Sequence, residues 1–280
     1  MGKKARRRGL QRVLFVVALV GGLTAGAGLF VGGALAARDA SVDEDAGGDA
    51  RGSSTTTTTV APTTTSTTAP PTTTTTEPAA ADGALEAGEH GPEVSALQAR
   101  LADLGYWLGT ADGTYGQLTR QAVMAFQKAN GLSRDGVAGP ATLAALETAG
   151  RPMPRVPSGS HIEIDLDRQI LLVVQDGQTR WVLNTSTGNG EAYAAPGGGT
   201  AVATTPRGSF AVEREIDGLR EAPLGTLYRP KYFHGGIAIH GAGQIPAHPA
   251  SHGCARVTNS AMDLLWSSGV TTLGTPVEVY

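Results

Sequence analysis

The chain has 280 residues, 40% hydrophobic and 17% charged, which is enough for one or two folded domains with a substantial core. Its formal net charge of −3 is unevenly distributed: residues 1–12 carry six basic side chains and no acidic one, whereas residues 81–280 carry 14 basic and 19 acidic side chains. This mildly acidic folded part lacks the basic surface needed to bind phosphates, which argues against a nucleic acid partner.

An apolar segment follows the basic residues 1–12. Residues 13–37 carry no charged side chain, and a helix of this length, at about 1.5 Å per residue, crosses the roughly 30 Å hydrocarbon core of a membrane. Because basic residues stay in the cytoplasm, we interpret 1–12 as a cytoplasmic tail and 13–37 as a transmembrane anchor. A cleaved signal peptide is the alternative, since Ala34-Leu35-Ala36 matches an A-x-A cleavage site. Both interpretations export the rest of the chain.

Residues 38–84 are predicted to form a disordered linker. Fifteen of the 24 residues from 53 to 76 are threonine, with prolines between them. Such a segment has almost nothing to bury and does not offset its ordering entropy. Extended at roughly 3.1 Å per residue, the linker would reach on the order of 100 Å from the membrane. It is either a generic spacer or a tether that lifts the folded part into a cell wall.

Residues 85–150 are predicted to be helical. Apolar residues recur there every three or four positions, the spacing of one buried helix face. The connectors "TADGTYG" and "SRDGVAG" are similar, each with an Asp-Gly turn, and Gly139-Pro140 signals the start of a third helix. The apolar positions are Val94, Leu97, Leu101 and Leu104, then Ala122, Val123 and Phe126, then Leu143 and Leu146.

This segment resembles the three-helix type of bacterial peptidoglycan-binding module. The match runs through "VSALQARLADLGYW", "DGTYGQLTRQAVMAFQKANGL" and "DGVAGPATLAAL". The resemblance implies a compact bundle that binds peptidoglycan glycan or stem peptides. Most of the matching residues are typical of cores and turns, so they support the prediction of the fold more strongly than the prediction of binding. Tyr106, Trp107 and Tyr115 are candidate contacts, with packing as the alternative.

After a proline-rich linker at 151–160, the apolar period changes to two, which is typical of strands. "HIEIDLD" and "QILLVVQ" come first, and Asp176-Gly177 then separates them from "QTRWVLNTS". An Asp-Gly pair between two such runs predicts a hairpin. Further strands are expected in "RGSFAVERE", "GIAIH" and "TPVEVY".

Residues 161–280 are therefore predicted to be a mostly-β sandwich or barrel. One helix is expected at 260–268, capped by Thr258 or Asn259. The glycine-rich stretch 188–199 lacks the Lys-Ser/Thr of a phosphate-binding loop, so we expect a mobile loop there. The overall fold class is multidomain, with a small all-α module ahead of a mostly-β domain.

The single cysteine, Cys254, lies in "HPASHGCARVTN". A lone cysteine is most often a small buried hydrophobic residue. A metal site with His240, His248 and His252 is a second option, but no CxxC or HExxH pair supports it, and we expect no metal and no cofactor. A third option is a nucleophile, because Cys254 follows a glycine in a polar turn whose backbone N–H groups favour a thiolate, and histidines are near.

The motifs "IHG" (239–241) and "SHGCARV" (251–257) resemble the signature of the L,D-transpeptidases, cysteine enzymes that crosslink bacterial peptidoglycan. "STG" (186–188), "TPRGSF" (205–210) and "GTPVEV" agree with this resemblance. It covers about residues 160–280 and implies a β-sandwich with few helices. Carbapenems inhibit the family.

The resemblance implies a role for each matching residue. Cys254 becomes the nucleophile, and His240 the base, with its other ring nitrogen held by a backbone carbonyl such as that of Gly241. His252 supports the thiolate charge or the departing amine. Backbone N–H groups of His252, Gly253 and Cys254 would form an oxyanion hole, with Ser251 orienting them. Which histidine takes the proton stays open.

Substrate contacts follow from the same resemblance. Arg256 would hold a stem-peptide carboxylate. Tyr228, Tyr232 and Phe233 are candidates for the donor groove, with core packing as the alternative. For His234 and His248 we expect a structural or rim role.

The implied reaction is a two-step acyl transfer. The thiolate attacks the carbonyl between a diamino acid and the terminal D-alanine of a tetrapeptide stem, D-alanine leaves, and a neighbouring side-chain amine resolves the thioester into a 3→3 crosslink. Attack by water would give L,D-carboxypeptidase activity. Attachment of another amine and an inactive wall-binding scaffold are further alternatives.

Overall fold

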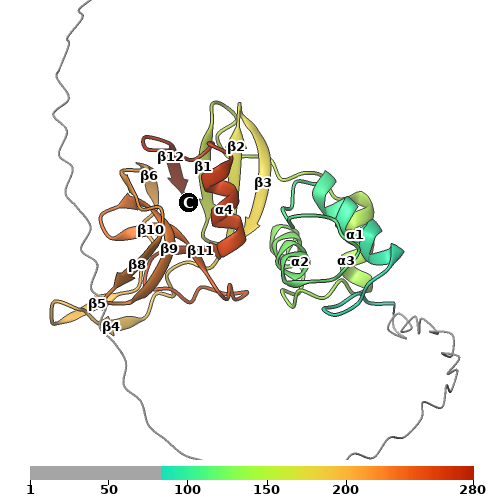
Figure 1. Cartoon of the computed structure of the whole chain (residues 1–280), viewed down its shortest axis with the longest axis horizontal. Helices are drawn as coiled ribbons and strands as arrows, with labels where there is room; N and C mark the ends of the chain where they lie inside the picture. The colour runs from blue at the N-terminus through green and yellow to red at the C-terminus, as the bar shows by residue number, and fades with distance from the viewer. Residues whose placement is uncertain (1–82) are drawn as a thin grey trace, which may run out of the picture. The chain divides into compact units, whose positions relative to one another are not determined.

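A computed structural model describes residues 83–280, and Figure 1 traces their helices and strands. The predicted cytoplasmic tail at 1–12, the membrane segment at 13–37 and nearly all of the linker at 38–84 lie outside the described residues. Within 83–280, no helix has both the length and the apolar composition that crossing a membrane requires.

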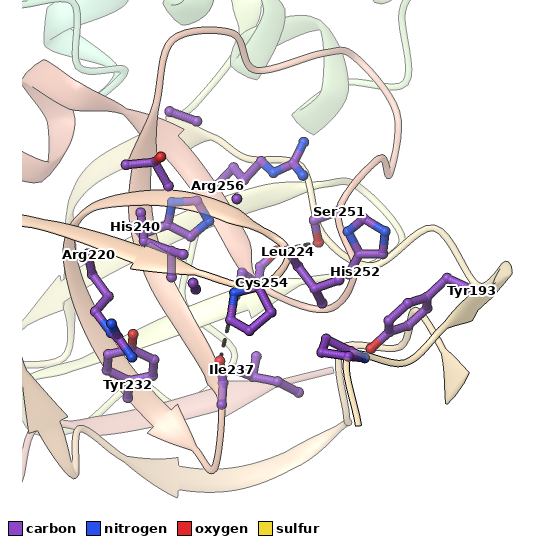
Figure 2. A pocket seen from close by; sticks show the side chains of 18 of the residues that line it. Tyr193, Arg220, Leu224, Tyr232, Ile237, His240, Ser251, His252, Cys254 and Arg256 are labelled. Carbon is purple, nitrogen blue, oxygen red and sulfur yellow. Dashed lines mark hydrogen bonds between the residues drawn. The ribbon is translucent and has the colours of Figure 1, made fainter. Parts of the chain in front are cut away.

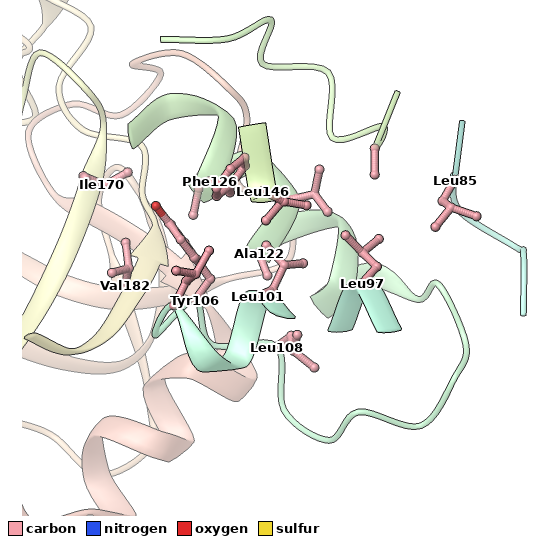
Figure 3. Packing of buried hydrophobic residues seen from close by; sticks show 14 of the residues in the cluster. Leu85, Leu97, Leu101, Tyr106, Leu108, Ala122, Phe126, Leu146, Ile170 and Val182 are labelled. Carbon is pink, nitrogen blue, oxygen red and sulfur yellow. The ribbon is translucent and has the colours of Figure 1, made fainter. Parts of the chain in front are cut away.

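Three helices form the first part of the described chain, as predicted. They are α1 (Pro92–Asp103), α2 (Gln117–Ala129) and α3 (Pro140–Thr148). Proline opens α1 and α3, where a missing N–H costs no helical hydrogen bond. The apolar faces of the helices meet in the cluster of Figure 3, in which Leu101 and Phe126 are fully buried.

The same hydrogen-bond pattern stabilises both Asp-Gly connectors of this helical module. In each, a buried glutamine accepts the N–H of the turn glycine and donates to the turn aspartate and to a threonine of the following helix. The first set is Gln98, Asp112, Gly113 and Thr119, and the second is Gln127, Asp135, Gly136 and Thr142. The similarity of the connectors therefore reflects a shared turn geometry.

Two of the module's three candidate aromatic contacts are packing residues. Tyr106 is fully buried, with its ring edge-on to that of Phe126 at 5.4 Å between centroids. Tyr115 is buried too, and its hydroxyl donates to the carbonyl of Gly136 at 2.9 Å. Trp107 is partly buried against the core of the following domain. These positions support the fold of the module.

Residues 161–280 form the predicted β domain. Its strands are β1 (His161–Asp165), β2 (Ile170–Gln175), β3 (Gln178–Asn184), β4 (Ala192–Ala194), β5 (Thr200–Val202), β6 (Gly208–Ala211), β7 (Arg214–Glu215), β8 (Leu219–Ala222), β9 (Gly225–His234), β10 (Ile237–Ala242), β11 (Ala255–Thr258) and β12 (Pro276–Val279). One sheet has the order β3-β2-β1-β12-β6, and another has the order β11-β10-β9-β7 with β8 on β9. Side chains from both sheets share one core, as in a sandwich.

The structure confirms two predictions made from local sequence, the β2–β3 hairpin and the cap of the C-terminal helix. Asp176 and Gly177 have φ of 51° and 75°, the pair of positive values that a tight β2–β3 hairpin needs. The helix α4 (Asn259–Ser267) is capped by Thr258, whose Oγ1 accepts the N–H of Ala261 at 3.1 Å.

Two expectations need correction. The stretch 188–199 is not simply a loop, because it contains β4, which pairs antiparallel with β5 directly after it. In β1, the alternation of Ile162 with Glu163 does not separate a core face from a solvent face, since Glu163 is fully buried. Its carboxylate accepts the backbone N–H groups of 155 and 156 and the hydroxyl of Tyr280. Burial raises the pKa of Glu163, but these hydrogen bonds outweigh it, and the pKa lies below its ordinary value.

The helical module and the β domain share a hydrophobic cluster (Figure 3). Tyr106 pairs in parallel with Val182 of β3, and the N–H of Val182 donates to the carbonyl of Gly105 at 2.8 Å. Ile170 and Leu172 of β2 belong to the same cluster. The linker at 151–160 therefore joins two parts that are packed on each other.

Candidate active site

A cavity of about 540 Å³ contains both Cys254 and His240 (Figure 2). Strands β7 to β11, the segment between β8 and β9, the β4–β5 hairpin and residues 251–254 line it. Its size is within the range of small-molecule and peptide sites. It is the natural candidate for an active site.

Strand alternation brings the candidate residues to this cavity. Strands β10 and β11 run parallel, with His240 opposite Arg256. Ile239 and Ala255 face the core of the sandwich, so the residues next to them along each strand face the other way. His240, Cys254 and Arg256 consequently share the cavity face.

Cys254 has an environment that keeps its thiol protonated. The Sγ atom accepts the backbone N–H of Ala238 at 3.4 Å and donates to the carbonyl of Gly236 at 3.9 Å. Burial raises the pKa of the Cys254 thiol, and the Ala238 hydrogen bond and the charge of Arg256 offset this only partly. The Ala238 N–H favours the thiolate, as expected of backbone donors, but burial outweighs it and leaves the pKa of Cys254 above its ordinary value.

His240 is suited to accept the thiol proton. Its Nδ1 lies 2.8 Å from the carbonyl of Gly241, as the family resemblance implied, and this acceptor fixes a tautomer with the proton on Nδ1 and a free lone pair on Nε2. Burial lowers the pKa of His240 to about 4; the Gly241 hydrogen bond opposes this lowering, while the charge of Arg256 adds to it. At neutral pH the ring is therefore uncharged.

Neighbouring atoms leave no room for a side chain at Gly241. A Cβ at this position would lie 2.6 Å from Oδ1 of Asn259 and 2.8 Å from Cδ1 of Tyr228. A side chain would push away the strand whose carbonyl orients His240. The glycine of the "IHG" motif is thus part of the site's geometry.

His252 occupies a different environment from His240. It is exposed at the rim of the cavity, and its ring meets that of Tyr193 from β4 edge-on, with 4.7 Å between centroids. It has neither the burial nor the backbone acceptor that defines the tautomer of His240. The ring of His252 is placed to contact a ligand that enters past the β4–β5 hairpin.

Ser251 holds the loop that carries the cysteine. Its hydroxyl donates to the carbonyl of Cys254 at 2.6 Å and accepts the N–H of Gly253 at 3.0 Å. Gly253 has a φ of 139°, and a Cβ there would lie 2.9 Å from the carbonyl oxygen of Thr204, so only glycine fits. Because its N–H is already engaged, Gly253 is not a free oxyanion donor in this structure, contrary to the sequence-based expectation.

The "STG" segment at 186–188 supports this loop from behind. Ser186 pairs with Arg256, and Gly188 pairs with Ser251. The carbonyl of Thr187 accepts the N–H of Ser251 at 2.9 Å. The motif therefore positions the cysteine loop through its backbone.

Two of the four predicted substrate-binding residues line the cavity, Arg256 and Tyr232. Phe233 does not, because it follows Tyr232 in β9 and points into the core, where its ring packs on Phe210. Tyr228 does not line it either, and its hydroxyl donates to Asp263 at 2.8 Å.

A β-bulge explains why Tyr228 and Tyr232 differ. In a regular strand, residues separated by an even number of positions have their side chains on the same face, so Tyr228 and Tyr232 would both line the cavity. In β9, Arg229 has a positive φ of 50°. The register of β9 with β10 shifts there, because Lys231 pairs with Ile239 but Tyr228 pairs with Gly241. The extra residue turns Tyr228 away from the cavity.

Among the cavity-lining residues that the sequence did not indicate are Tyr193, Arg214 and Arg220, an aromatic ring and two positive charges. Arg214 lies over the ring of Tyr232, 3.6 Å from its centroid. The lining contains Arg214, Arg220 and Arg256 and no Asp or Glu, so the cavity favours an anionic ligand. Arg214 and Arg220 lie on the short strands β7 and β8, distant in sequence from the cysteine motif, and no local signal marks them.

The remaining histidines lie elsewhere. His234 is exposed beside Phe210, and His248 is exposed, with its backbone carbonyl accepting the hydroxyl of Ser186 at 2.8 Å. Across residues 83–280, no three His, Cys, Asp or Glu side chains gather in a way that could hold a metal ion.

Comparison with known proteins defines the class of each part. Residues 90–146 match the family described as "Putative peptidoglycan binding domain", and residues 159–279 match the "L,D-transpeptidase catalytic domain". The crystal structure of an L,D-transpeptidase from Xylanimonas cellulosilytica is 55% identical, with a TM-score of 0.69, and the match covers 73% of this chain and 100% of that one. The chain belongs to the L,D-transpeptidase family.

Curated relatives match over shorter stretches. N-acetylmuramoyl-L-alanine amidase CwlM of Mycobacterium tuberculosis is 47% identical over 57 residues, which are 20% of this chain and 14% of that protein. Amidase CwlL of Bacillus licheniformis is 47% identical over 68 residues, 24% of this chain and 19% of that protein. The chain spans less than a fifth of the length of these relatives, so their amidase activity is not carried over.

Proposed function

We propose that this protein is a peptidoglycan L,D-transpeptidase that forms 3→3 crosslinks through a thioester on Cys254. The observation that carries the proposal is that one cavity is lined by both Cys254, whose thiol pKa is raised, and a buried, uncharged His240. Family membership supports the same reaction. The lining arginines suit a donor stem that carries carboxylates.

In the first step, Sγ of Cys254 attacks the carbonyl carbon between the diamino acid and D-alanine. His240 Nε2 accepts the thiol proton as the S–C bond forms, since the thiol is not ionised beforehand. The backbone N–H groups of His252 and Cys254 are the proposed donors to the oxyanion. The C–N bond then breaks, D-alanine leaves with the proton from His240, and a thioester remains.

In the second step, the side-chain amine of a neighbouring stem attacks the thioester carbonyl. His240 accepts a proton from this amine, an amide bond forms, the C–S bond breaks, and the departing sulfur recovers the proton. Exclusion of water from the cavity decides between crosslinking and hydrolysis. Tyr193 and His252, which meet at the rim, are the proposed contacts for the incoming stem.

A defined substrate tests the proposal. The purified protein should release D-alanine from a tetrapeptide stem and produce a 3→3 linked dimer, measured by liquid chromatography and mass spectrometry of the muropeptides. Release of D-alanine without a dimer, at high stem concentration, would indicate an L,D-carboxypeptidase. Absence of both products from a folded protein that still binds peptidoglycan would indicate a wall-binding scaffold and overturn the proposal.

We also propose that the catalytic part works outside the cytoplasmic membrane, carried there by residues 1–37 and held at peptidoglycan by the helical module. The substrate lies in the cell wall, and the basic and apolar pattern of 1–37 supports export. In spheroplasts producing the full chain, added protease should degrade residues 83–280, and deletion of 1–37 should protect them. Intact mass of the membrane-bound protein distinguishes an anchor from cleavage after residue 36.

A further inference from the structure

Lys128 of α2 is a buried amine with no acidic partner in its hydrogen bonds. Only 1% of it is exposed. Its Nζ donates to Oδ1 of Asn184 at 2.5 Å, to the carbonyl of Thr185 at 2.9 Å and to that of Gln169 at 3.1 Å. All three acceptors belong to the β domain, whereas Lys128 belongs to the helical module.

Such a group restricts how the module sits on the β domain. Three acceptors match the three N–H groups of an ammonium, although burial, with a smaller contribution from Arg134, lowers the pKa of Lys128 to about 7. A misplaced Lys128 would leave buried polar groups unsatisfied, which costs more than a hydrogen bond is worth. An apolar contact surface would tolerate sliding much better.

One connection leads from Lys128 to the segment before the cysteine loop. Asn184, which accepts from Lys128, donates through Nδ2 to Oε1 of Gln121 at 2.6 Å and to the carbonyl of Ile245 at 3.3 Å. Gln117 of α2 donates to the carbonyl of Gly243 at 3.1 Å. Helix α2 thus holds the backbone between β10 and the cysteine loop.

A second connection leads to Ser251 itself. The side chain of Gln169, whose carbonyl accepts from Lys128, bonds to both the Oγ1 and the N–H of Thr187. The carbonyl of Thr187 accepts the N–H of Ser251. In parallel, the hydroxyl of Thr185 donates to the carbonyl of Arg256 at 2.8 Å. Hydrogen bonds from Lys128 therefore lead to Ser251, before Cys254, and to Arg256, after it.

We infer that the helical module has a second task besides binding the wall: Lys128 is a positioning residue that fixes the Cys254 loop through Asn184, Gln169 and Thr185. The inference rests on the proposed transpeptidase function for its kinetic consequence. Its structural consequence, order in residues 245–256, does not depend on that function. The module and the β domain then make one catalytic unit.

The test replaces Lys128 by methionine, which keeps an unbranched side chain of nearly the same length and removes the donors. Arg120→Met is the matched control, because Arg120 is an exposed cation of the same helix that bonds within the module. With Lys128→Met, kcat for D-alanine release from a soluble stem should fall about 10- to 100-fold, as expected for a shifted nucleophile. KM should change less than about 2-fold, and binding to insoluble peptidoglycan should be unchanged.

Hydrogen exchange supplies a readout that does not need activity. Amides of residues 245–256 should exchange faster in Lys128→Met than in Arg120→Met, while α1 to α3 keep their protection. Unchanged exchange in 245–256 would overturn the inference even if the protein had no transpeptidase activity. Should Lys128→Met fail to fold, Gln121→Leu removes one link of the first connection and is judged by the same exchange measurement.

Discussion

Replacement of Cys254 by alanine is expected to lower the rate of D-alanine release and of 3→3 dimer formation by at least about 10⁴-fold, because no other group can form the covalent intermediate. Cys254 is the only cysteine in the chain. A carbapenem should therefore add its mass to the intact wild-type protein and not to the variant, which mass spectrometry measures directly.

The control for this prediction is wall binding. The Cys254→Ala variant should bind insoluble peptidoglycan as the wild type does, since the helical module is unchanged, and this shows that lost activity is not lost folding. A carbapenem adduct on the variant, or D-alanine release near the wild-type rate, would contradict the assignment of the nucleophile. The rate of D-alanine release by Cys254→Ser should be close to that of Cys254→Ala, because a hydroxyl is a far weaker nucleophile near neutral pH than a thiol.

Replacement of His240 by glutamine is expected to lower kcat/KM by about 10²- to 10⁴-fold, the usual contribution of a general base. His252→Gln serves as the comparison and should cost less than about 10-fold, because His252 is exposed at the rim and lacks the backbone acceptor of His240. Steady-state rates of D-alanine release from one defined stem measure both. A larger loss in His252→Gln would reverse the assignment of the base.

The pH dependence follows from the same residue. The pKa of His240 is lowered to about 4, so the neutral base is present above this pH and is lost as the pH falls through about 4. The unfolded chain binds the proton near the ordinary histidine value of about 6.5, so stability declines as the pH falls from about 6.5 to about 4. His240→Gln should remove this contribution to acid unfolding, which thermal melts at pH 7 and pH 4.5 would detect.

The neutral pair also decides how the thiol responds to alkylation. A resting thiolate would react rapidly with iodoacetamide at neutral pH, whereas the raised pKa of Cys254 predicts slow alkylation that accelerates as the pH rises. In the proposed mechanism, the nucleophile is then activated only when a substrate carbonyl is in place. This fits a site whose proton transfer accompanies attack.

Several features were determined by the sequence alone because their causes are local. Apolar spacing marked the three helices, Asp176-Gly177 marked the hairpin through its positive φ values, and Thr258 capped α4 through a bond three residues away. The motif around Cys254 identified the family for the same reason, since its glycine, serine and histidine lie within four residues of each other.

Other features depended on contacts between segments far apart in the chain. The bulge at Arg229 turned Tyr228 out of the cavity, and strand alternation sent Phe233 into the core. Burial by surrounding strands, which no spacing reveals, lowered the pKa of His240 and raised that of the Cys254 thiol.

The relation between the two folded parts was likewise a matter of tertiary structure. The sequence indicated a module, a proline-rich linker and a β domain, and nothing local showed that the first and last share a core. Lys128 resembles any surface lysine in the sequence, yet its acceptors lie 41 to 57 residues further along the chain. The sequence by itself indicated the family through a local motif, whereas packing between distant segments decided that His240, and not His252, is buried, and what holds the cysteine loop in place.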